Sequence, residues 1–276
     1  MEKLRIDWQH PININIQLQL AQDKTNNDNQ PILYGAEKAH YEVYNKDGFI
    51  GDTRAGGPCN FGYVNIAPHL NGTHTECAGH ITDERRFITD INTSTPSLAL
   101  LVTVSPVLLM DSGESYSGKF HEEDYVITGR SLKETVDKVI NLKRNPPKAL
   151  IIRTQPNGPE KKQEDYTNKQ VPYFTEQAIQ FLDTYDFKHL LTDLPSIDRL
   201  DDGGKLANHF DYFGCDLDGF CDKEKSKRTI TEMIFVPNIV SDGTYCLQMN
   251  VAQWQLDAAP SYPVLFPILG EFSKVG

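Results

Sequence analysis

Apolar and polar side chains alternate without a break over residues 11–20, where every even-numbered position carries Ile or Leu. This period of two predicts a long β-strand with one buried face. Residues 97–111 form instead an almost continuous apolar run, which is typical of a strand that is buried on both faces. The chain is therefore expected to build a sheet that contains both half-buried and fully buried strands.

Two later segments have the pattern of amphipathic helices. Residues 128–142 place their apolar side chains on one stripe and predict a helix of about three turns, which must end before the prolines at 146–147. Residues 175–182 combine a capping threonine with helical periodicity and predict a second helix. Short apolar runs at 149–154 and 189–193 follow these helices and predict buried strands. The alternation of strands and helices indicates an α/β fold with parallel strand pairs.

Strand-like runs return at 229–236 and 244–252, and the chain has no internal repeat or low-complexity tract. Its 276 residues are enough to bury one large core. We therefore expect a single α/β domain over residues 1–276, in which a mixed central β-sheet is flanked by a few helices.

The charge and the apolar stretches of the chain argue against several kinds of partner and location. It has 27 basic and 38 acidic side chains, a net charge of −11, and no basic surface of the kind that binds nucleic acid. The apolar stretch at 98–110 is interrupted by polar residues and is shorter than the ~20 residues of a membrane-spanning helix. The first eight residues lack the apolar core of a signal peptide. We expect a cytoplasmic protein that has no nucleic-acid or membrane partner.

The five cysteines are an odd number scattered over a long chain, unlike the disulfide framework of a small secreted protein. We expect reduced thiols. Cys215 and Cys221 are not accompanied by a second pair of ligands, which argues against a structural zinc site there.

Residues 71–80 are the segment that indicates metal binding or catalysis, because they carry two histidines and a carboxylate that strand or helix patterning does not explain. If this part of the chain is extended, His74 and Glu76 point to the same side. Imidazole nitrogen and carboxylate oxygen together suit a borderline divalent metal. His80 follows beyond the strand and could return over the site as a base. On spacing alone, polar residues that are hydrogen-bonded by chance remain an equal alternative.

The same segment resembles the signature His-x-Gly-Thr-His-x-Asp-x-Pro-x-His of the cyclase family of metal-dependent hydrolases, which includes bacterial kynurenine formamidase and isatin hydrolase. Gly72, Thr73, His74 and His80 match this signature, and Glu76 stands where the family has Asp. Further similarities follow in the family's order: the opening strand at 11–20, the helix start at 127–132, Arg153-Thr154, the segment 192–198, the strand at 230–234 and the closing segment at 259–260.

The resemblance implies a barrel-like core with a swivelling β/β/α-like arrangement and a divalent metal site. It implies His74, Glu76, His209 and Glu232 as metal ligands and His80 as catalytic base. The ion would be Mn or Zn. Residues 212–228 are then an inserted loop between the two later ligands.

The resemblance also implies a homodimer or higher homo-oligomer, with residues 1–10 and 31–60 as candidates for the subunit interface.

The chain departs from the signature at three positions. Leu70 stands where the family has its first His, while His69 lies one position earlier. On a strand, a shift of one residue would turn His69 to the opposite face, so it does not replace the missing ligand. Because the two-metal centre of the formamidases uses that histidine, we predict a single metal ion. Glu76 extends its carboxylate roughly 1.5 Å further than Asp would, and Ala78 replaces a Pro.

The predicted reaction is hydrolysis of an amide or cyclic amide, such as an arylformamide, isatin or a cyclic imide. A bound divalent ion lowers the pKa of water toward ~7, and His80 accepts the proton as water attacks the carbonyl. The chain contains neither a Gly-x-Ser-x-Gly nucleophile motif nor a phosphate-binding loop motif. Two alternatives stay open: a cyclase or dehydratase of secondary metabolism, and a non-catalytic metal-binding relative.

Overall fold

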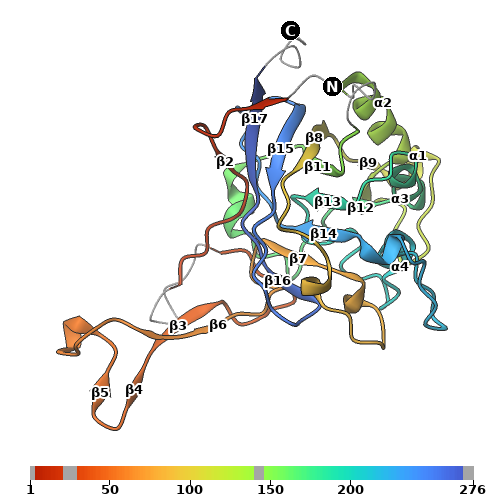
Figure 1. Ribbon diagram of the computed structural model, residues 1–276. Helices are drawn as coiled ribbons and strands as arrows, with labels where there is room; N and C mark the ends of the chain where they lie inside the picture. Colours follow the sequence, from red (N-terminus) through yellow and green to blue (C-terminus); the bar gives the residue numbers. More distant parts are fainter. Residues whose placement is uncertain (1–3, 21–29, 140–145, 270–276) are drawn as a thin grey trace.

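The computed structural model describes residues 4–20, 30–139 and 146–269. Within these ranges the core is one mixed sheet of ten strands (Figure 1). Its order from edge to edge is β1 (Arg5–Ile6), β17 (Val264–Leu269), β15 (Gly243–Gln248), β8 (Ser97–Val104), β11 (Ala149–Thr154), β13 (His189–Thr192), β14 (Thr229–Glu232), β7 (His74–Glu76) and β16 (Ala258–Pro260), with β2 (Ile12–Asn13) also paired to β17.

The strands β8, β11, β13 and β14 are parallel neighbours in the middle of the sheet. Parallel strands need crossover connections, and each connection here carries a helix. The three helices are α2 (Gly129–Val139), α3 (Glu176–Asp183) and α4 (Ala207–Phe213). This arrangement confirms the prediction of a single α/β domain with a mixed central sheet and a few flanking helices.

The parallel strands are buried on both faces. Leu100 of β8 packs with Leu132 of α2 on the face that the helices cover (Figure 1), whereas Leu101 packs with Ile14 on the opposite face. Because successive residues of a strand point to opposite sides, both faces need apolar residues, as the continuous apolar run predicts. Among the described helices none is both long and apolar enough to cross a membrane.

The other elements are short. They are the strands β9 (Val107–Leu108), β10 (Tyr125–Ile127) and β12 (Tyr173–Phe174), the helix α1 (Leu109–Ser112), and the 3-10 turns η1 (Thr53–Ala55), η2 (Ala78–His80), η3 (Ile88–Asp90), η4 (Pro159–Gln163) and η5 (Lys225–Lys227). Two hairpins, β3 (His40–Val43) with β6 (Gly62–Asn65) and β4 (Asn45–Lys46) with β5 (Phe49–Ile50), extend away from the sheet as an arm of residues 40–65 (Figure 1).

Two predicted strands are shorter than expected. In residues 11–20 only Ile12 and Asn13 form a regular ladder, although the predicted alternation persists as burial of Ile14 and Ile16. In residues 97–111 strand β8 ends at Val104, just before a proline that cannot donate to a ladder, and the rest of the run forms β9 and α1. The helix predicted over 128–142 is α2, and residues 140–142 lie outside the described ranges.

The expectation that all five cysteines are reduced thiols is wrong for one pair, since Cys215 and Cys221 form a disulfide. An isolated antiparallel bridge between the two residues brings their Cα atoms to 4.0 Å. The turn between them is held by Asp216, whose side chain accepts hydrogen bonds from the backbone N–H groups of Asp218 and Phe220. This disulfide lies within residues 212–228, directly after α4.

Candidate metal centre

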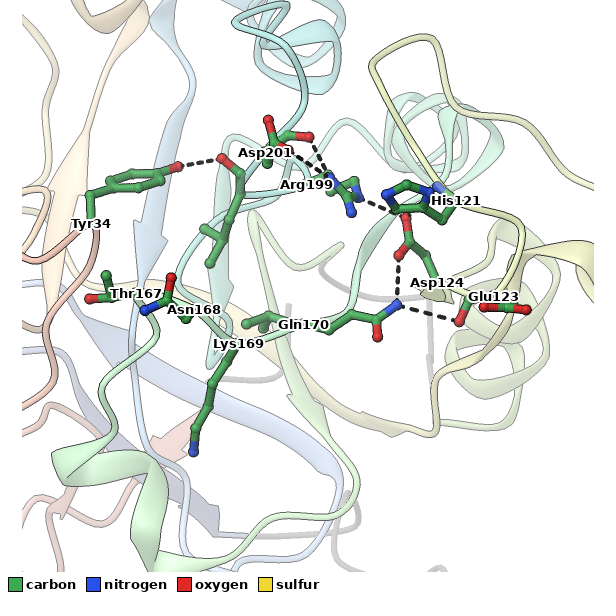
Figure 2. Close-up of a pocket in the computed structure, with 12 residues that line it drawn as sticks. Tyr34, His121, Glu123, Asp124, Thr167, Asn168, Lys169, Gln170, Arg199 and Asp201 are labelled. Atoms are coloured by element: carbon green, nitrogen blue, oxygen red, sulfur yellow. Dashed lines mark hydrogen bonds and ion pairs between the residues drawn. The ribbon is translucent and has the colours of Figure 1, made fainter.

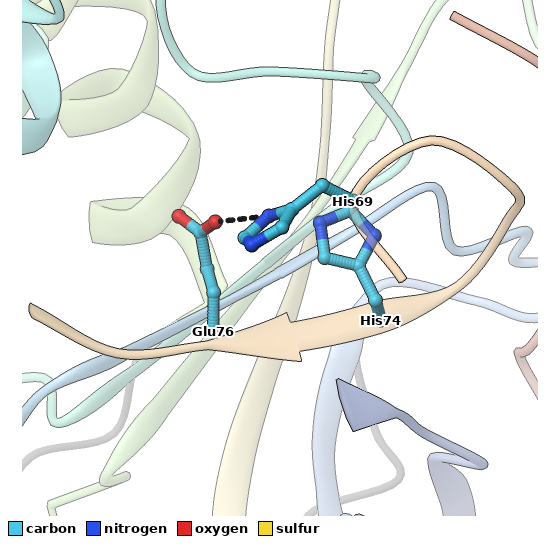
Figure 3. Close-up of side chains that lie close together, drawn as sticks. All are labelled: His69, His74 and Glu76. Atoms are coloured by element: carbon cyan, nitrogen blue, oxygen red, sulfur yellow. Dashed lines mark ion pairs between the residues drawn. The ribbon is translucent and has the colours of Figure 1, made fainter. Parts of the chain in front are cut away.

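The motif segment lies on β7, which pairs with β14 on one side and with β16 on the other. His74 and Glu76 are two residues apart and share one face of the strand (Figure 3). The register sets Glu232 of β14 directly across from His74. The pairing of β7 with β14 thereby brings the second carboxylate to the motif.

Glu76 is fully buried and lies at the centre of the group. Its Oε1 is 3.0 Å from Nε2 of His209, and its Oε2 is 3.1 Å from Nδ1 of His69 and 4.0 Å from Nε2 of His80. One carboxylate thus faces three imidazoles that come from the segment before β7, from η2 and from α4.

Three of the histidines hold one ring nitrogen in a hydrogen bond that leaves the other nitrogen facing a buried carboxylate. The three bonds join Nδ1 of His74 to the carbonyl oxygen of Gly72 at 2.9 Å, Nε2 of His69 to Oδ2 of Asp257 at 2.8 Å, and Nδ1 of His209 to Oδ2 of Asp198 at 2.6 Å. Hydrogen bonds of this kind fix the tautomer and orientation of metal-ligating histidines.

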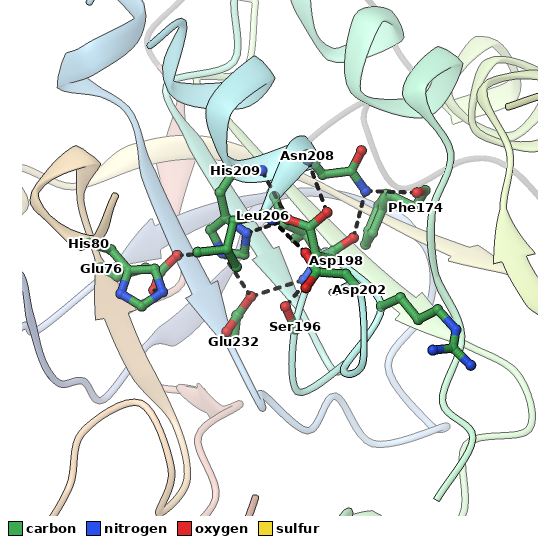
Figure 4. Close-up of polar contacts among 12 residues, drawn as sticks. Glu76, His80, Phe174, Ser196, Asp198, Asp202, Leu206, Asn208, His209 and Glu232 are labelled. Carbon is green, nitrogen blue, oxygen red and sulfur yellow. Dashed lines mark hydrogen bonds and ion pairs between the residues drawn. The ribbon is translucent and has the colours of Figure 1, made fainter. Parts of the chain in front are cut away.

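The segment 196–198 positions both later residues of the group (Figure 4). Asp198 accepts hydrogen bonds from the backbone N–H of His209 at 3.1 Å and from the hydroxyl of Tyr116 at 2.7 Å, in addition to the ring of His209. The backbone N–H of Ile197 donates to Oε1 of Glu232 at 3.0 Å. A single loop therefore orients one imidazole and one carboxylate.

His80 ends the turn η2 at the more open side of the group, with 27% of its side chain exposed. Its ring stacks on that of His69 at 4.2 Å between centroids, and its Nδ1 is 3.5 Å from Oδ2 of Asp257. Gly79 allows the tight turn, because a Cβ there would lie 2.1 Å from the carbonyl oxygen of Arg86.

The charges of the group are strongly coupled. Burial alone would raise the pKa of Glu76, but His80 and His209 hold it well below its usual range. Burial would lower the pKa of His209, yet the charge of Glu76 raises it well above the ordinary value. Burial also opposes protonation of His69, but its bonds to Asp257 and Glu76 raise its pKa to about 10. The ionised carboxylate of Glu76 is thus balanced by protons on His69 and His209.

These residues fit a metal ion. Nε2 of His74 and both carboxylate oxygens of Glu76 are buried and make no well-aligned hydrogen bond among the described residues, which is costly for buried polar atoms. Their nearest polar partners are Glu232, His209 and His69, in ion pairs of 3.0 to 3.5 Å. His69, His74 and Glu76 each offer a ligand atom within 4.8 Å of the others (Figure 3). Glu76, His80 and His209 form a second such group. Nitrogen and carboxylate donors together suit Zn²⁺ or Mn²⁺.

Pairwise contacts of 4.0 Å or less link the residues that the sequence singled out, namely His74, Glu76, His80, His209 and Glu232. Of these, His74 and His209 belong to different groups of mutually close ligand atoms. The distance from Nε2 of His209 to Oε1 of Glu232 is 3.9 Å, although the chain between them carries the 212–228 loop.

The expectation that His69 faces away from the site is wrong. It assumed a strand, but residues 67–71 form a turn in which the N–H groups of Leu70 and Asn71 both donate to the carbonyl oxygen of Ala67. The alternation of faces in a strand does not apply in a turn, and the ring of His69 enters the cluster.

Sequence reasoning missed Asp198 and Asp257. Asp198 lies in the segment 192–198, whose resemblance to the family was the available signal, although it gave no role to this residue. Asp257 directly precedes β16 and is far from the motif in sequence, so no spacing connects it to the histidines.

A cavity of about 590 Å³ is lined in part by residues 199–201, which directly follow the segment that orients His209 (Figure 2). Its wall includes Arg199, whose Nε donates to Asp124 at 2.7 Å, and Tyr34, whose hydroxyl donates to the carbonyl oxygen of Leu200 at 2.9 Å. Its lining includes none of the clustered histidines and acids, so it is distinct from the candidate metal centre.

Comparison with solved structures finds the same fold in proteins of low sequence identity. A structure described as an isatin hydrolase bound to the product analogue thioisatinate is 11% identical, with a TM-score of 0.60, and the match covers 94% of this chain and 92% of that one. Isatin hydrolase A from Labrenzia aggregata is 11% identical, with a TM-score of 0.59 and 93% of both chains covered. A predicted metal-dependent hydrolase from Bacillus stearothermophilus is 12% identical, with a TM-score of 0.55 and coverage of 93% and 98%.

A search of curated protein sequences found no match. The family model for cyclases matches residues 6–199, which is more than half of the chain and includes the whole motif from Gly72 to His80. The chain therefore belongs to the cyclase family.

Proposed function

We propose that this protein is a metal-dependent hydrolase that cleaves the C–N bond of an amide or cyclic amide. The observation that carries the proposal is the buried group of imidazole nitrogens and carboxylate oxygens around Glu76, in which Nε2 of His74 and both oxygens of Glu76 make no well-aligned hydrogen bond among the described residues. Such a set is costly to bury unless a cation completes it.

One divalent ion, Mn²⁺ or Zn²⁺, would be held by His74, Glu76, His209 and Glu232. When bound, it would lower the pKa of water and polarise the scissile carbonyl. The chain itself supplies the rigid frame, because three of these residues sit on the paired strands β7 and β14, and His209 is fixed by Asp198 through both its backbone and its ring.

His80 is the general base of the proposed reaction. It is one of the two partly exposed imidazoles of the group, and its Nε2 lies 4.0 Å from the central carboxylate of Glu76. A base in this place can accept the proton of an attacking water and return it to the leaving nitrogen.

The substrate class is an arylformamide, isatin or a cyclic imide. Isatin hydrolases share the fold of this chain, and isatin is itself a cyclic amide. The proposed hydrolysis is tested by incubating the purified protein with arylformamides, anilides, isatin and cyclic imides, with Mn²⁺ or Zn²⁺ added and with chelator-treated protein as the control.

Hydrolysis of at least one compound that requires the added metal is the expected result. Turnover in H₂¹⁸O should place one labelled oxygen in the product, which separates hydrolysis from the ring closure or dehydration of a cyclase. Metal binding without turnover of any compound would favour a non-catalytic relative and contradict the proposal.

The proposed enzyme acts as a homodimer or higher homo-oligomer, with residues 1–10 and 31–60 at the interface together with the rest of the arm of residues 40–65. The arm supports this proposal because it extends from the sheet and leaves large apolar side chains exposed, including Phe61 and Tyr63. Its occupant would be a second copy of the chain.

A further inference from the structure

The family signature begins with a histidine, and this chain has Leu70 in its place. The side chain of Leu70 does not enter the metal centre, because it packs against the apolar cluster that contains Ile16, Leu33 and Met233. The nitrogen ligand that the signature would supply must therefore come from another residue or be missing.

The turn at 67–71 turns His69 toward Glu76. The N–H groups of Leu70 and Asn71 donate to the carbonyl oxygen of Ala67, at 2.9 and 3.1 Å, and the side chain of Asn71 accepts from the N–H of Ala67 at 2.8 Å. These three bonds fix the turn at both of its ends. His69 consequently has a defined backbone position from which its ring reaches Glu76.

Asp257 fixes the orientation of that ring. It directly precedes β16, and its backbone carbonyl accepts the N–H of Cys77 at 3.0 Å, so its position is tied to the strand that carries the motif. Its Oδ2 accepts Nε2–H of His69 at 2.8 Å. The bond leaves Nδ1 of His69 3.1 Å from Oε2 of Glu76, and His69, His74 and Glu76 each offer a ligand atom within 4.8 Å of the other two.

We propose that His69 is the third imidazole ligand of the metal centre, that it binds through Nδ1, and that Asp257 is the residue that positions it. His74 and His209 would bind through Nε2, since their Nδ1 atoms are bonded to Gly72 and Asp198. This inference rests on the proposed metal-dependent function and assigns to it a ligand at a position that the signature does not use.

The test measures the affinity of the ion-free chain for Zn²⁺ by competition with a chromophoric chelator. His69→Ala should weaken binding by about a hundredfold or more, and Asp257→Ala by about 10- to 100-fold, the usual effect of removing a residue that orients a ligating histidine. Asp257→Asn should lose less, because the amide oxygen can still accept the bond from Nε2. Asp218→Ala removes an equal charge from an exposed loop and should leave the affinity unchanged.

Two further variants show whether Asp257 acts through His69. His69→Ala with Asp257→Ala should bind no more weakly than His69→Ala alone, because the residue to be positioned is already absent. Leu70→His in the His69→Ala background should not restore binding, because position 70 points into the apolar cluster. Thermal unfolding of the ion-free variants checks that they are folded.

Unchanged affinity in His69→Ala, additive effects of the two alanine substitutions, or restoration by Leu70→His would overturn the assignment while the proposed function stands. A wild-type chain that binds no Zn²⁺ would overturn both. If the variants show the expected binding pattern but the chain hydrolyses no substrate, the assignment of His69 as a ligand would be supported and the proposed activity contradicted.

Discussion

At the scale of single residues, the candidate site is organised by the two ring nitrogens of each imidazole. One nitrogen of His69, His74 and His209 is occupied by an oxygen of the protein, so only the other is available. Because a histidine that is bonded in this way keeps one orientation and presents one defined nitrogen to the ion, ion binding would require little rearrangement beyond loss of the proton on that nitrogen. The site is thus preorganised by hydrogen bonds that the motif itself does not contain.

Replacement of His80 separates metal binding from proton transfer. His80→Ala should reduce turnover by about 100-fold or more, which is the typical contribution of a general base. Its Zn²⁺ content should stay near the wild-type value, because the proposed ligands are other residues. Turnover measured beside metal analysis checks this, with Glu232→Gln as the comparison that should lose metal. A His80→Ala protein with wild-type turnover would exclude the proposed base.

The affinity for metal should increase with pH. His69 has a pKa raised to about 10 by Asp257 and Glu76 against the effect of burial, and that of His209 is raised well above its ordinary value. Both imidazoles are protonated near neutral pH, and an ion must displace those protons. Release of one or two protons corresponds to an increase of about 10- to 100-fold in affinity per pH unit.

Chelator competition between about pH 6 and pH 8 measures this slope, once the proton dependence of the chelator is subtracted. In His69→Ala the gain in metal affinity per pH unit should be about tenfold smaller, because this variant has one proton fewer for the ion to displace. An affinity that does not change with pH would contradict the protonation of both imidazoles.

At the scale of elements, the sequence predicted the parallel core well and the antiparallel surroundings poorly. Strand β11, strand β13 and helix α3 lie within a residue of the predicted positions, because continuous apolar runs and a threonine cap are local signals. The alternating run at 11–20 is also local, but the length of a ladder depends on partner strands from distant parts of the chain.

The same limit applies to the candidate site. His74 and Glu76 follow from the period of one short strand. The predicted face of His69 is wrong because the turn before β7 depends on a hydrogen bond that the side chain of Asn71 accepts from the N–H of Ala67. Asp257 reaches the site only through the pairing of β16 with β7. Residues that orient ligands come from tertiary contacts, which a motif does not encode.

The turn η2 should tolerate no side chain at Gly79. Gly79→Ala would place a Cβ 2.1 Å from the carbonyl oxygen of Arg86, so the backbone must shift. We expect a loss of about 1–3 kcal/mol in the free energy of unfolding, as for other overpacked positions. Because the shift would also move His80, turnover should fall by more than the loss of folded protein accounts for. Urea unfolding and turnover of the variant test this, and unchanged values for both would show that η2 can move freely.

His189, the first residue of β13, should make stability depend on pH. Burial and the charge of Lys188 lower its pKa to about 4, so the unfolded chain binds a proton more readily than the folded one. This contribution to stability is present above about pH 6.5 and is lost as the pH falls toward 4. Between about pH 7.5 and pH 5 the wild type should lose up to about 2 kcal/mol more than His189→Gln. Equal losses in urea unfolding would exclude the effect.

At the scale of the whole molecule, the fold brings the site together from both halves of the chain. The motif at 74–80 lies within residues 6–199 that match the family model, whereas His209, Glu232 and Asp257 lie beyond them. The antiparallel insertion of β7 between β14 and β16 joins the two parts. An ion bound at this junction would link segments distant in sequence, so Zn²⁺ should raise the midpoint of thermal unfolding.

The arm of residues 40–65 extends beyond the sheet, and it is only marginally stable without a surface to cover it. Four aromatic residues of the arm, Tyr44, Phe49, Phe61 and Tyr63, contact one another, with 4.9 Å between the ring centroids of Tyr44 and Phe61. Even so, 44% of Phe61 and 59% of Tyr63 are exposed. A two-stranded hairpin is only marginally stable in water, so a second copy that covers these rings would stabilise it.

Replacement of both Phe61 and Tyr63 by Ser should therefore shift the proposed dimer toward the monomer, as measured by light scattering coupled to gel filtration. Tyr125 is equally exposed, at 50%, but lies on β10 away from the arm, and Tyr125→Ser should leave the dimer intact. The arm contributes nothing to the buried clusters of the sheet, so the thermal unfolding of the body should hardly change in the double variant. A wild-type chain that is monomeric at about 50 μM, or a double variant that remains dimeric, would show that the aromatic face of the arm does not hold two copies together.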